Sequence, residues 1–542
     1  MKKFTFTFIA FLCAIGLFAQ GNFQTSFEQQ QDDVYELSFN LDSWELNEYT
    51  INGTTYQYVD MNVSTVTKKT GWAELPIISA SIQLQKQKDV DFEIVYTDYT
   101  DYELEYPMLP SRGVIYRNQD PSSIPYTIDP ESIVDSFYPE ELATMEDPFI
   151  FRDVRGTSVR LTPFRYNAVT NTLRVYNRVK VRMIENDDEP TNPLLSDHVN
   201  TIKEVECIYQ NMFLNYAPPA AKPSASLSMS EYGDILVITT STYEAAMEPY
   251  IQWKKEKGYN VTSTIVSTGT NVATTIQNAY NSNPNLMFVQ LAGDWADIKS
   301  PTINVTTSAD PCDPFMGAVS GSDNYLDIAV GRFSCANTTE LTTQVNKTIT
   351  YERDPDMTSG WRETFIGIGS DEGSGIGDDS EIDYTHVQRI YNNRLDPFTY
   401  NTHEQNYDPG ASATAVAADV NSGASTIAYC GHGLEDQFYT SGYSNSYVNA
   451  STNGDKLPFI VSVACINGAF HYGSDCFAEA WLQKSGGGAI VTWMSTINQP
   501  WTPPQRGQDY FYDILSGGFN YDTDGISQTT GYNTTEQRTH WG

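Results

Sequence analysis

The feature that most constrains the fold of this chain is a change in hydrophobic pattern at about residue 231. Before it, apolar and polar residues alternate, as in 77–84 and 172–181, and long helical periodicity is absent. After it, short β-branched runs alternate with amphipathic helical segments. The first pattern predicts an antiparallel, all-β, sandwich-like domain. The second predicts an α/β domain with a mostly parallel sheet flanked by helices.

A chain of 542 residues is long enough for about two or three domains. We expect the β-sandwich-like domain to cover 20–215. Residues 216–230 are rich in Pro, Ala and Ser and lack any period, which predicts an exposed, flexible linker. Two α/β subdomains are then expected, A over 231–360 and B over 361–542.

Within the α/β part, the alternation can be read element by element. Strands are predicted at 234–239, 260–266, 286–292, 364–369, 425–430, 457–464 and 488–493. Helices are predicted at 243–257, 339–351, 382–393, 411–420, 475–484 and 507–515.

The N-terminus is typical of a secretory signal peptide. Lys2 and Lys3 precede an apolar stretch from Phe4 to Phe18, and we expect the signal to cover 1–19. The protein is therefore expected to be secreted or bound at the cell surface. The formal net charge of −36 argues against a nucleic-acid partner.

Cysteine usage indicates neither a zinc site nor a disulfide framework. Of the seven cysteines, Cys13 lies in the signal peptide, and the others form no CxxC pair and show no regular spacing.

Two residues with complementary chemistry follow two of the predicted strands. His432 comes just after the apolar run 425–430, and Cys465 ends the run 457–464. Both runs stop in Gly-containing turns. Because ligands and chemistry collect at the C-terminal ends of parallel strands, we expect the imidazole and the thiol to be neighbours.

A buried cysteine at a strand end is more often an inert small hydrophobe. The matching position of His432 favours a different interpretation, because a thiol needs a nearby base to act as a nucleophile. Glycines flank His432 and leave a backbone N–H free to stabilise an oxyanion. The pair therefore predicts a cysteine peptidase.

Three segments, 427–433, 458–470 and 495–509, resemble the gingipain family of caspase-like cysteine peptidases. The resemblance runs from about Asp234 to the end of the chain. It implies a caspase-like catalytic fold, a propeptide in the upstream β domain, synthesis as a zymogen, and export by the family's type IX secretion machinery. In that family further domains follow, so we expect subdomain B to be truncated at its C-terminus.

The resemblance also implies roles for individual residues. Cys465 would be the nucleophile and His432 the base and later the acid, and the N–H groups of Gly433 and Cys465 would form the oxyanion hole. Glu372 would orient the imidazole, with its neighbour Asp371 as the competitor for that role.

Substrate specificity is implied by Asp383, Trp501 and Gln505. Asp383 matches the carboxylate at the floor of the S1 pocket in Arg-specific members, where a buried acid selects a basic P1 side chain. Trp501 matches the aromatic that covers the P1 stem. Gln505 stands where the family has an apolar wall, which leaves the choice between Arg and Lys open. Asp383 also suits the first turn of a helix, where the dipole favours a carboxylate.

A structural calcium ion is implied as cofactor, with no organic cofactor. Its expected ligands are Asp294, Asp323 and Asp327 with the carbonyls of Ser320 and Tyr325. Independently, 320–327 offers oxygen ligands at alternating positions, as a hard cation needs. Without the resemblance, the same segment reads as an acidic turn.

The sequence thus predicts a secreted cysteine endopeptidase that cuts proteins and peptides after Arg, with Lys as the alternative, and is held inactive by its own propeptide. Lys203, just before the linker, is the expected site of self-processing. Two alternatives stay open: a sortase-like transpeptidase with the same dyad, and a secreted adhesin whose dyad is vestigial.

Overall fold

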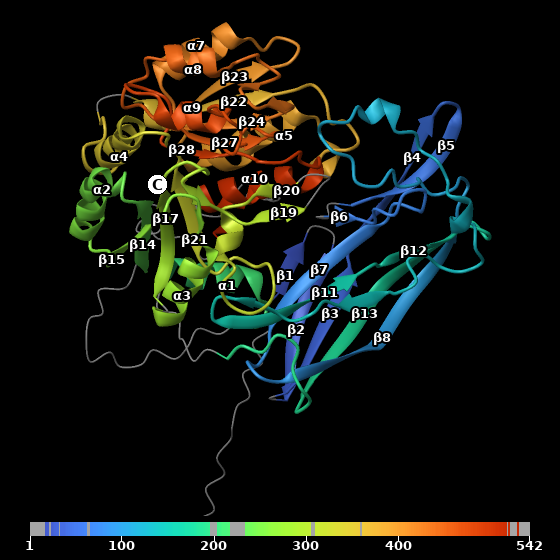
Figure 1. Cartoon of the computed structure of the whole chain (residues 1–542). Coiled ribbons are helices and arrows are strands. Elements are labelled where there is room, and N and C mark those ends of the chain that lie inside the picture. Colours follow the sequence, from blue (N-terminus) through green and yellow to red (C-terminus); the bar gives the residue numbers. More distant parts are fainter. Residues whose placement is uncertain are drawn as a thin grey trace, which may run out of the picture.

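The computed structural model describes residues 17–20, 23–31, 33–61, 65–195, 203–216, 233–283, 285–304, 309–357, 360–516, 519–520 and 528–529. It consists of an N-terminal β region lying beside two α/β layers (Figure 1). This arrangement confirms the predicted fold class. The predicted signal peptide and linker fall almost entirely outside the described residues, so both stay predictions.

The N-terminal region contains two antiparallel sheets. The first has the order β1-β2-β3-β13-β12, with β8 also paired to β13. The second has the order β10-β11-β7-β6, with β9 paired to β11. The strands are β1 (Leu17–Gln20), β2 (Phe23–Gln31), β3 (Val34–Leu41), β6 (Thr65–Val66), β7 (Pro76–Gln83), β8 (Asp89–Glu103), β9 (Ala143–Met145), β10 (Phe149–Phe151), β11 (Val154–Leu161), β12 (Phe164–Asn167) and β13 (Thr172–Asn186).

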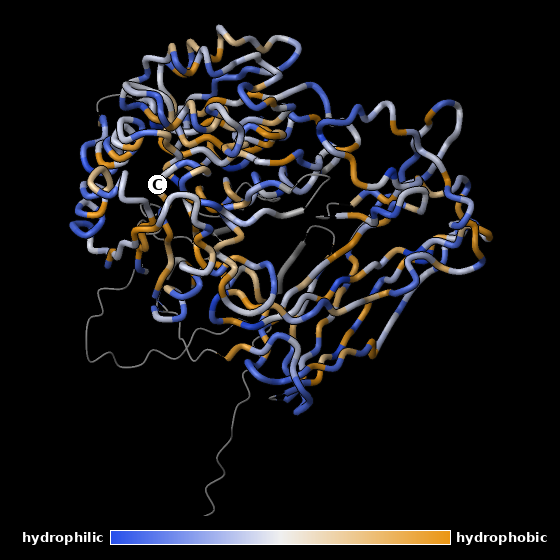
Figure 2. The backbone as a smooth tube through the Cα atoms, viewed as in Figure 1, coloured by the Kyte–Doolittle hydropathy of each residue, from blue (hydrophilic) through white to orange (hydrophobic). Residues whose placement is uncertain are grey.

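Alternation along these strands creates the core between the sheets (Figure 2). On β13, Val179, Val181 and Met183 are buried, whereas the intervening side chains reach the surface. A hairpin of β4 (Glu45–Ile51) and β5 (Thr54–Asp60) and the helix α1 (Lys203–Met212) complete the region. After α1, the Asn215 side chain accepts the Gln83 N–H and donates to the Gln83 carbonyl at the end of β7, so the N-terminal region includes this residue.

Subdomain A is a parallel sheet of order β15-β14-β17-β21 with helices on both faces. Helices α2 and α4 cover one face and α3 the other. Every residue of β14 is buried, as expected for a strand covered on both faces. The elements are β14 (Asp234–Thr240), α2 (Glu244–Glu256), β15 (Val261–Val266), α3 (Ala273–Ser282), β17 (Leu286–Ala292), β21 (Ala329–Phe333) and α4 (Thr338–Arg353). Two small ladders, β16 (Thr270–Asn271) with β18 (Ile298–Lys299) and β19 (Thr302–Asn304) with β20 (Ala309–Pro311), lie at its edge.

Subdomain B is a second parallel sheet of order β23-β22-β24-β27-β28. Helices α7, α8 and α9 pack on one face, and α5 and α10 on the other. Its strands are β22 (Thr364–Gly369), β23 (Thr402–Tyr407), β24 (Thr426–Cys430), β27 (Phe459–Val463) and β28 (Val491–Trp493). Its helices are α5 (Asp383–Ile390), which continues as a π-helical turn (Tyr391–Leu395), α6 (Asp396–Phe398), α7 (Ala413–Ser422), α8 (Asn445–Ala450), α9 (Phe477–Gln483) and α10 (Thr502–Leu515). Short ladders pair β25 (Gly433–Leu434) with β26 (Gln437–Phe438) and β29 (Phe519–Asn520) with β30 (Gln528–Thr529).

The two subdomains are joined through α4 and α9. The Lys347 ammonium on α4 donates to the carbonyls of Trp481 and Leu482 at 3.1 and 2.9 Å, close to the end of α9. The buried Glu479 carboxylate accepts from Ser334 at 2.6 Å. These bonds fix the two sheets relative to each other.

The prediction placed most α/β elements correctly but missed some. Helix α10 starts at Thr502, five residues earlier than predicted, because Pro503 and Pro504 occupy its first turn, where a missing N–H costs nothing. Helix α3 and strands β21 and β23 were not predicted.

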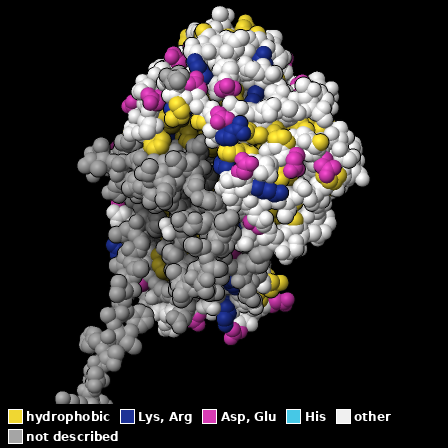
Figure 3. All heavy atoms as spheres, turned by 90° about the vertical axis from the view of Figure 1, so that its left-hand side faces the viewer, with side chains coloured by type: hydrophobic (Ala, Val, Ile, Leu, Met, Phe, Trp, Pro, Cys, Tyr) yellow, Lys and Arg dark blue, Asp and Glu magenta, His cyan; other side chains and the backbone are white. Residues whose placement is uncertain are grey.

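Among the described residues, no helix is both long and apolar enough to cross a bilayer. On the face shown in Figure 3, acidic and basic side chains of the described part are interspersed over the surface.

Candidate active site

Strand register brings Cys465 and His432 to the same edge of subdomain B. Strands β24 and β27 are parallel neighbours, and Cys430 is paired with Val463 at their ends. His432 and Cys465 each lie two residues beyond this pair. His432 and Cys465 therefore follow neighbouring strands at the same C-terminal edge of the sheet.

Gly433 allows the two turns to touch. A Cβ atom at this position would lie 2.3 Å from the Cys465 carbonyl oxygen and 2.8 Å from the Ala464 Cβ. Since real Cβ atoms do not approach so closely, only glycine lets the backbone after His432 pack against the backbone of Cys465.

The imidazole is held by a carboxylate from a third strand end. His432 Nε2 lies 2.7 Å from Glu372 Oε2, and Glu372 follows β22, the neighbour of β24. Glu372 and the adjacent Asp371 are both exposed, so the 2.7 Å contact with His432 is what distinguishes Glu372. Glu372 is therefore the residue placed to orient the imidazole.

The Cys465 thiol is 2% exposed, and its sulfur accepts the Gln499 N–H at 3.4 Å. Burial raises the pKa of this thiol, while the Gln499 N–H and the nearby Arg117 guanidinium act in the opposite direction. The next residue, Ile466, has φ of 47°, a left-handed conformation that a β-branched side chain rarely adopts. The chain thus turns sharply immediately after the thiol.

Asp383 begins α5 and is fully buried behind the dyad, with four groups donating to its carboxylate. Ser370 Oγ donates to Oδ2 at 2.7 Å, and Gln505 Nε2 and Cys430 Sγ donate to Oδ1 at 3.0 and 3.1 Å. The fourth donor is the guanidinium of Arg117, which comes from the N-terminal region.

Arg117 occupies the pocket that the sequence assigns to the P1 side chain. Its two terminal nitrogens reach the two Asp383 oxygens at 2.9 Å each, and its guanidinium lies 4.2 Å from the centre of the Trp501 ring. Both charged side chains are 0% exposed. Burial by itself would raise the pKa of Asp383, but the Arg117 guanidinium outweighs it and holds that pKa below its ordinary value.

The backbone around Arg117 lies in the cleft as an added strand. Its N–H donates to the Gln499 carbonyl at 2.8 Å, and the Trp501 N–H donates to the Ile115 carbonyl at 3.2 Å. These two bonds hold the backbone of 115–117 in the cleft. A cavity of about 490 Å³ continues from here, lined by Glu372 and His432 and by the N-terminal segment 117–122.

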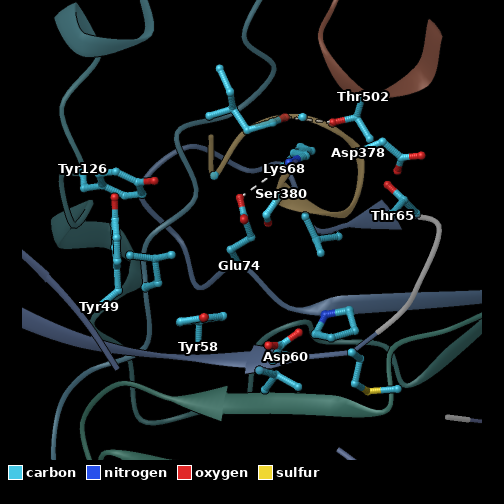
Figure 4. Close-up of a pocket in the computed structure, with 18 of the residues that line it drawn as sticks. Tyr49, Tyr58, Asp60, Thr65, Lys68, Glu74, Tyr126, Asp378, Ser380 and Thr502 are labelled. Atoms are coloured by element: carbon cyan, nitrogen blue, oxygen red, sulfur yellow. Dashed lines mark hydrogen bonds and ion pairs between the residues drawn. The ribbon is translucent and has the colours of Figure 1, made fainter. Parts of the chain in front are cut away.

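A second cavity, of about 450 Å³, lies where the β4–β5 hairpin region meets the loop of subdomain B that precedes α5 (Figure 4). Tyr49, Tyr58 and Tyr126 line it from one region, and Asp378 and Thr502 line it from the other. The N-terminal region thus covers the S1 side of the active site as well as filling it.

Three residues of the pocket were not predicted from the sequence. Ser370 follows β22 and Cys430 ends β24, so their strand-end positions were available as a signal. Arg117 lies 266 residues from Asp383 in a turn-rich segment, and nothing local marks it. The alternative interpretation of Asp383 as a first-turn residue of a helix is also correct, because α5 begins with it.

The residues predicted to bind calcium do not form one site. Asp294 follows the C-terminal end of β17, whereas Asp327 lies beside its start, where Arg152 Nη1 donates both to the Leu286 and to the Asp327 carbonyl. A strand of seven residues spans about 20 Å.

Among the described residues, no three His, Cys, Asp or Glu side chains are grouped as a metal site. Asp323 and Asp327 instead accept N–H groups, including those of Ile150 and Arg152. The single ligand set of Asp294, Ser320, Asp323, Tyr325 and Asp327 is therefore wrong, and calcium binding stays a prediction.

Comparisons with known proteins agree with this arrangement. Gingipain R1 of Porphyromonas gingivalis is 33% identical over 499 residues, which cover 90% of this chain and 49% of that protein. Gingipain R2 of strain W83 is 35% identical over 452 residues, covering 81% and 60%. The chain therefore spans about half the length of the curated relatives it matches.

Two solved structures are similar. The complex of the RgpB pro- and mature domains from P. gingivalis has a TM-score of 0.50 and 33% identity, covering 52% of this chain and 69% of that one. The crystal structure of the Arg specific cysteine proteinase gingipain R has a TM-score of 0.50 and 31% identity, covering 54% and 69%.

A family model described as Propeptide_C25 matches residues 22–217, and one described as peptidase family C25 matches 228–540. The second match covers the dyad, Glu372, Asp383 and Trp501. This chain belongs to peptidase family C25, with a propeptide region ahead of its catalytic region.

Proposed function

We propose that this chain is the latent form of a secreted cysteine endopeptidase that cuts polypeptides after arginine. The observation that carries the proposal is the Arg117 side chain bound to Asp383 beneath Trp501. A buried bidentate ion pair with a stacked guanidinium is the arrangement expected for an S1 pocket that selects arginine. The name of the similar solved structure, an Arg specific cysteine proteinase, supports the same choice over lysine.

The chemistry follows from the positions of the dyad. The Cys465 sulfur attacks the scissile carbonyl while His432 takes the thiol proton, and Glu372 stabilises the resulting imidazolium. The N–H groups of Gly433 and Cys465 are assigned to the oxyanion. His432 then returns its proton to the leaving amine, and water hydrolyses the thioester.

Latency is assigned to the N-terminal region, proposed to span 20–215 as the propeptide, and the segment 115–117 is the part that blocks the cleft. Lys203 is a poor processing site in this fold, because it is the first residue of α1 and a peptidase cleft binds extended chain. A cut within 216–230, the proposed linker, is favoured instead. Secretion with removal of 1–19, and export by a type IX machinery, complete the proposal.

The specificity test is P1 profiling of the activated protein on a peptide library, with the variant Asp383→Asn. We expect arginine to be preferred. The substitution should lower kcat/KM for arginine substrates. The expected decrease corresponds to a loss of roughly 2–4 kcal/mol in transition-state binding, the scale of breaking a buried charge pair. Unchanged arginine kinetics in Asp383→Asn would show that the S1 assignment is wrong.

Product analysis with an added amine nucleophile separates hydrolysis from transpeptidation. A thiol-directed probe that labels Cys465 only when His432 is intact separates a peptidase from an adhesin with a vestigial dyad.

Calcium binding is tested by the thermal midpoint with calcium and with a chelator. A midpoint that is the same in both would remove the ion from the proposal.

A further inference from the structure

The strand ladder does not by itself set the separation of the imidazole and the thiol. The ladder between β24 and β27 ends at the pair Cys430–Val463. One more main-chain bond follows, from the Gly431 N–H to the Val463 carbonyl at 3.1 Å. His432 and Cys465 lie beyond both, so their alignment depends on contacts between the two turns that carry them.

Asn467, two residues after the thiol, makes such a contact with its side chain. It is fully buried, and its Nδ2 donates to the Leu434 carbonyl at 2.5 Å and to the Gln437 carbonyl at 2.9 Å. Leu434 and Gln437 are paired in the β25–β26 hairpin, which begins directly after His432. One amide group therefore uses both of its N–H bonds to tie the turn of the thiol to the hairpin that follows the imidazole.

The amide is itself held in place on the side of the thiol. Ser462 Oγ on β27 donates to Asn467 Oδ1 at 3.1 Å, and the Asn467 carbonyl accepts the Ala478 N–H of α9 at 3.0 Å. Asn467 Nδ2 lies 3.0 Å from the point where a Cβ atom on Gly433 would stand. The amide thus packs against the backbone whose N–H is assigned to the oxyanion.

His432 and the hairpin form one unit. The His432 carbonyl accepts the Tyr439 N–H at 3.1 Å, just after β26, and it also accepts the hydroxyl of the buried Tyr429. Through its bonds to the hairpin, Asn467 therefore links His432 to the turn of Cys465.

We propose that Asn467 is a positioning residue, which holds the imidazole and the Gly433 N–H at their working distance from the thiol. The proposal rests on the proposed function for the reaction that the dyad performs. The S1 groups Asp383 and Trp501 come from the starts of α5 and α10 instead. Loss of the amide should therefore slow the chemical step and leave binding of the P1 side chain unchanged.

Asn453 offers a matched control in the same subdomain. It is also buried, and its Nδ2 donates to the carbonyls of Lys456 and Gly488 at 2.8 and 2.9 Å. These residues precede β27 and β28, at the edge of the sheet opposite the dyad. Asn453→Ala removes the same two kinds of bond as Asn467→Ala, so a purely structural role predicts similar effects of the two changes.

The first test compares the kinetics of these two variants on a short arginine substrate. Each chain carries an inserted protease site within 216–230, so that activation does not need the activity of the variant. We expect Asn467→Ala to lower kcat at least about tenfold. Its KM and its inhibition by benzamidine should stay at the values of the parent, and Asn453→Ala should keep the parent kcat. Equal kcat in the two variants, or a higher KM in place of a lower kcat, would overturn the proposal.

The second test needs no substrate. Alkylation by iodoacetamide is followed as a function of pH by mass spectrometry of the peptide that contains Cys465. A protonated imidazole close to the sulfur favours the thiolate and permits alkylation at lower pH. The profile of Asn467→Ala should therefore shift to higher pH, whereas that of Asn453→Ala should coincide with the parent. Coinciding profiles for Asn467→Ala and the parent would show that the amide does not position the dyad.

Asn467→Asp serves as a second variant, because it keeps the volume of the side chain and replaces both N–H groups by a carboxyl group. It should change kcat and the alkylation profile in the same direction. Failure of both Asn467 variants to bind benzamidine would assign this residue to folding and overturn the positioning role. A parent that cuts no arginine substrate, with alkylation that still depends on Asn467, would show that the proposed function has failed and the positioning has not.

Discussion

Gly433 shows how a single hydrogen atom in place of a side chain sets the geometry of this active site. Its neighbour His432 and the proposed nucleophile Cys465 follow different strands, and their alignment depends on two backbone turns in contact. The contact tolerates no Cβ atom, because the Cys465 carbonyl oxygen would lie 2.3 Å away.

We therefore expect Gly433→Ala to lower kcat/KM by about a hundredfold, since a shift of about 1 Å in a catalytic group has effects of this size. Gly473→Ala, at a glycine with open space around it, should retain activity and serves as the control. Kinetics on an arginine substrate are compared with the thermal midpoint of each variant. An active Gly433→Ala protein would mean that the turn can relax without moving His432.

The sequence identifies the residues whose positions depend on local pattern. Cys465, His432 and Glu372 follow β-branched or buried runs, so their shared sheet edge could be predicted from strand ends alone. Arg117 could not, because its partner Asp383 is 266 residues away and the pairing depends on how the two regions pack. Asp294 was wrongly assigned to the calcium ligand set with Asp323 and Asp327. The spacing of acidic residues in the sequence does not reveal that the whole length of a strand separates Asp294 from the other two.

At the scale of elements, the joint between α4 and α9 contains a buried ammonium that donates to main-chain carbonyls. Lys347 donates to the main-chain carbonyls of Trp481, Leu482 and Ala489, and burial lowers its pKa to about 7. Cations near the end of a helix are favourable, but desolvation of this one is costly. Helix α10 shows a similar dependence on context, since its two prolines lie in its first turn, ahead of the start predicted at 507.

This joint should make stability depend on pH. Between about pH 7 and pH 10.5 the unfolded chain holds the Lys347 proton and the folded chain does not, so stability rises with pH across this window. Lys347→Met lacks this contribution. In the Cys465→Ala background, the thermal midpoint of the parent minus that of Lys347→Met should therefore increase from pH 7 to pH 9. A constant difference would mean that Lys347 keeps its proton when folded.

At the scale of the whole molecule, the proposed latency rests on one region filling the cleft of the other. Removal of the Arg117 guanidinium leaves Asp383 buried without its charge partner, which is strongly destabilising for the closed arrangement. Arg117→Ala should therefore give the uncut chain at least about a tenfold higher initial rate on a short arginine substrate.

Arg160→Ala, at an exposed arginine of the same region, is the control and should stay latent. Gel analysis must show that the chain is intact when the rate is measured. Equal rates for the two uncut variants would mean that the contact which keeps the chain inactive lies outside the S1 pocket.

The contacts of residues 115–117 also indicate which peptide ligand would bind in this cleft. Two main-chain bonds to Gln499 and Trp501, together with the guanidinium on Asp383, hold Arg117 in the cleft beside His432. A tripeptide with the sequence Ile-Tyr-Arg, ending in an aldehyde, keeps all of these contacts and offers the sulfur an electrophile with no bond to cut. The chain thus contains the template for a reversible covalent inhibitor of its own activated form.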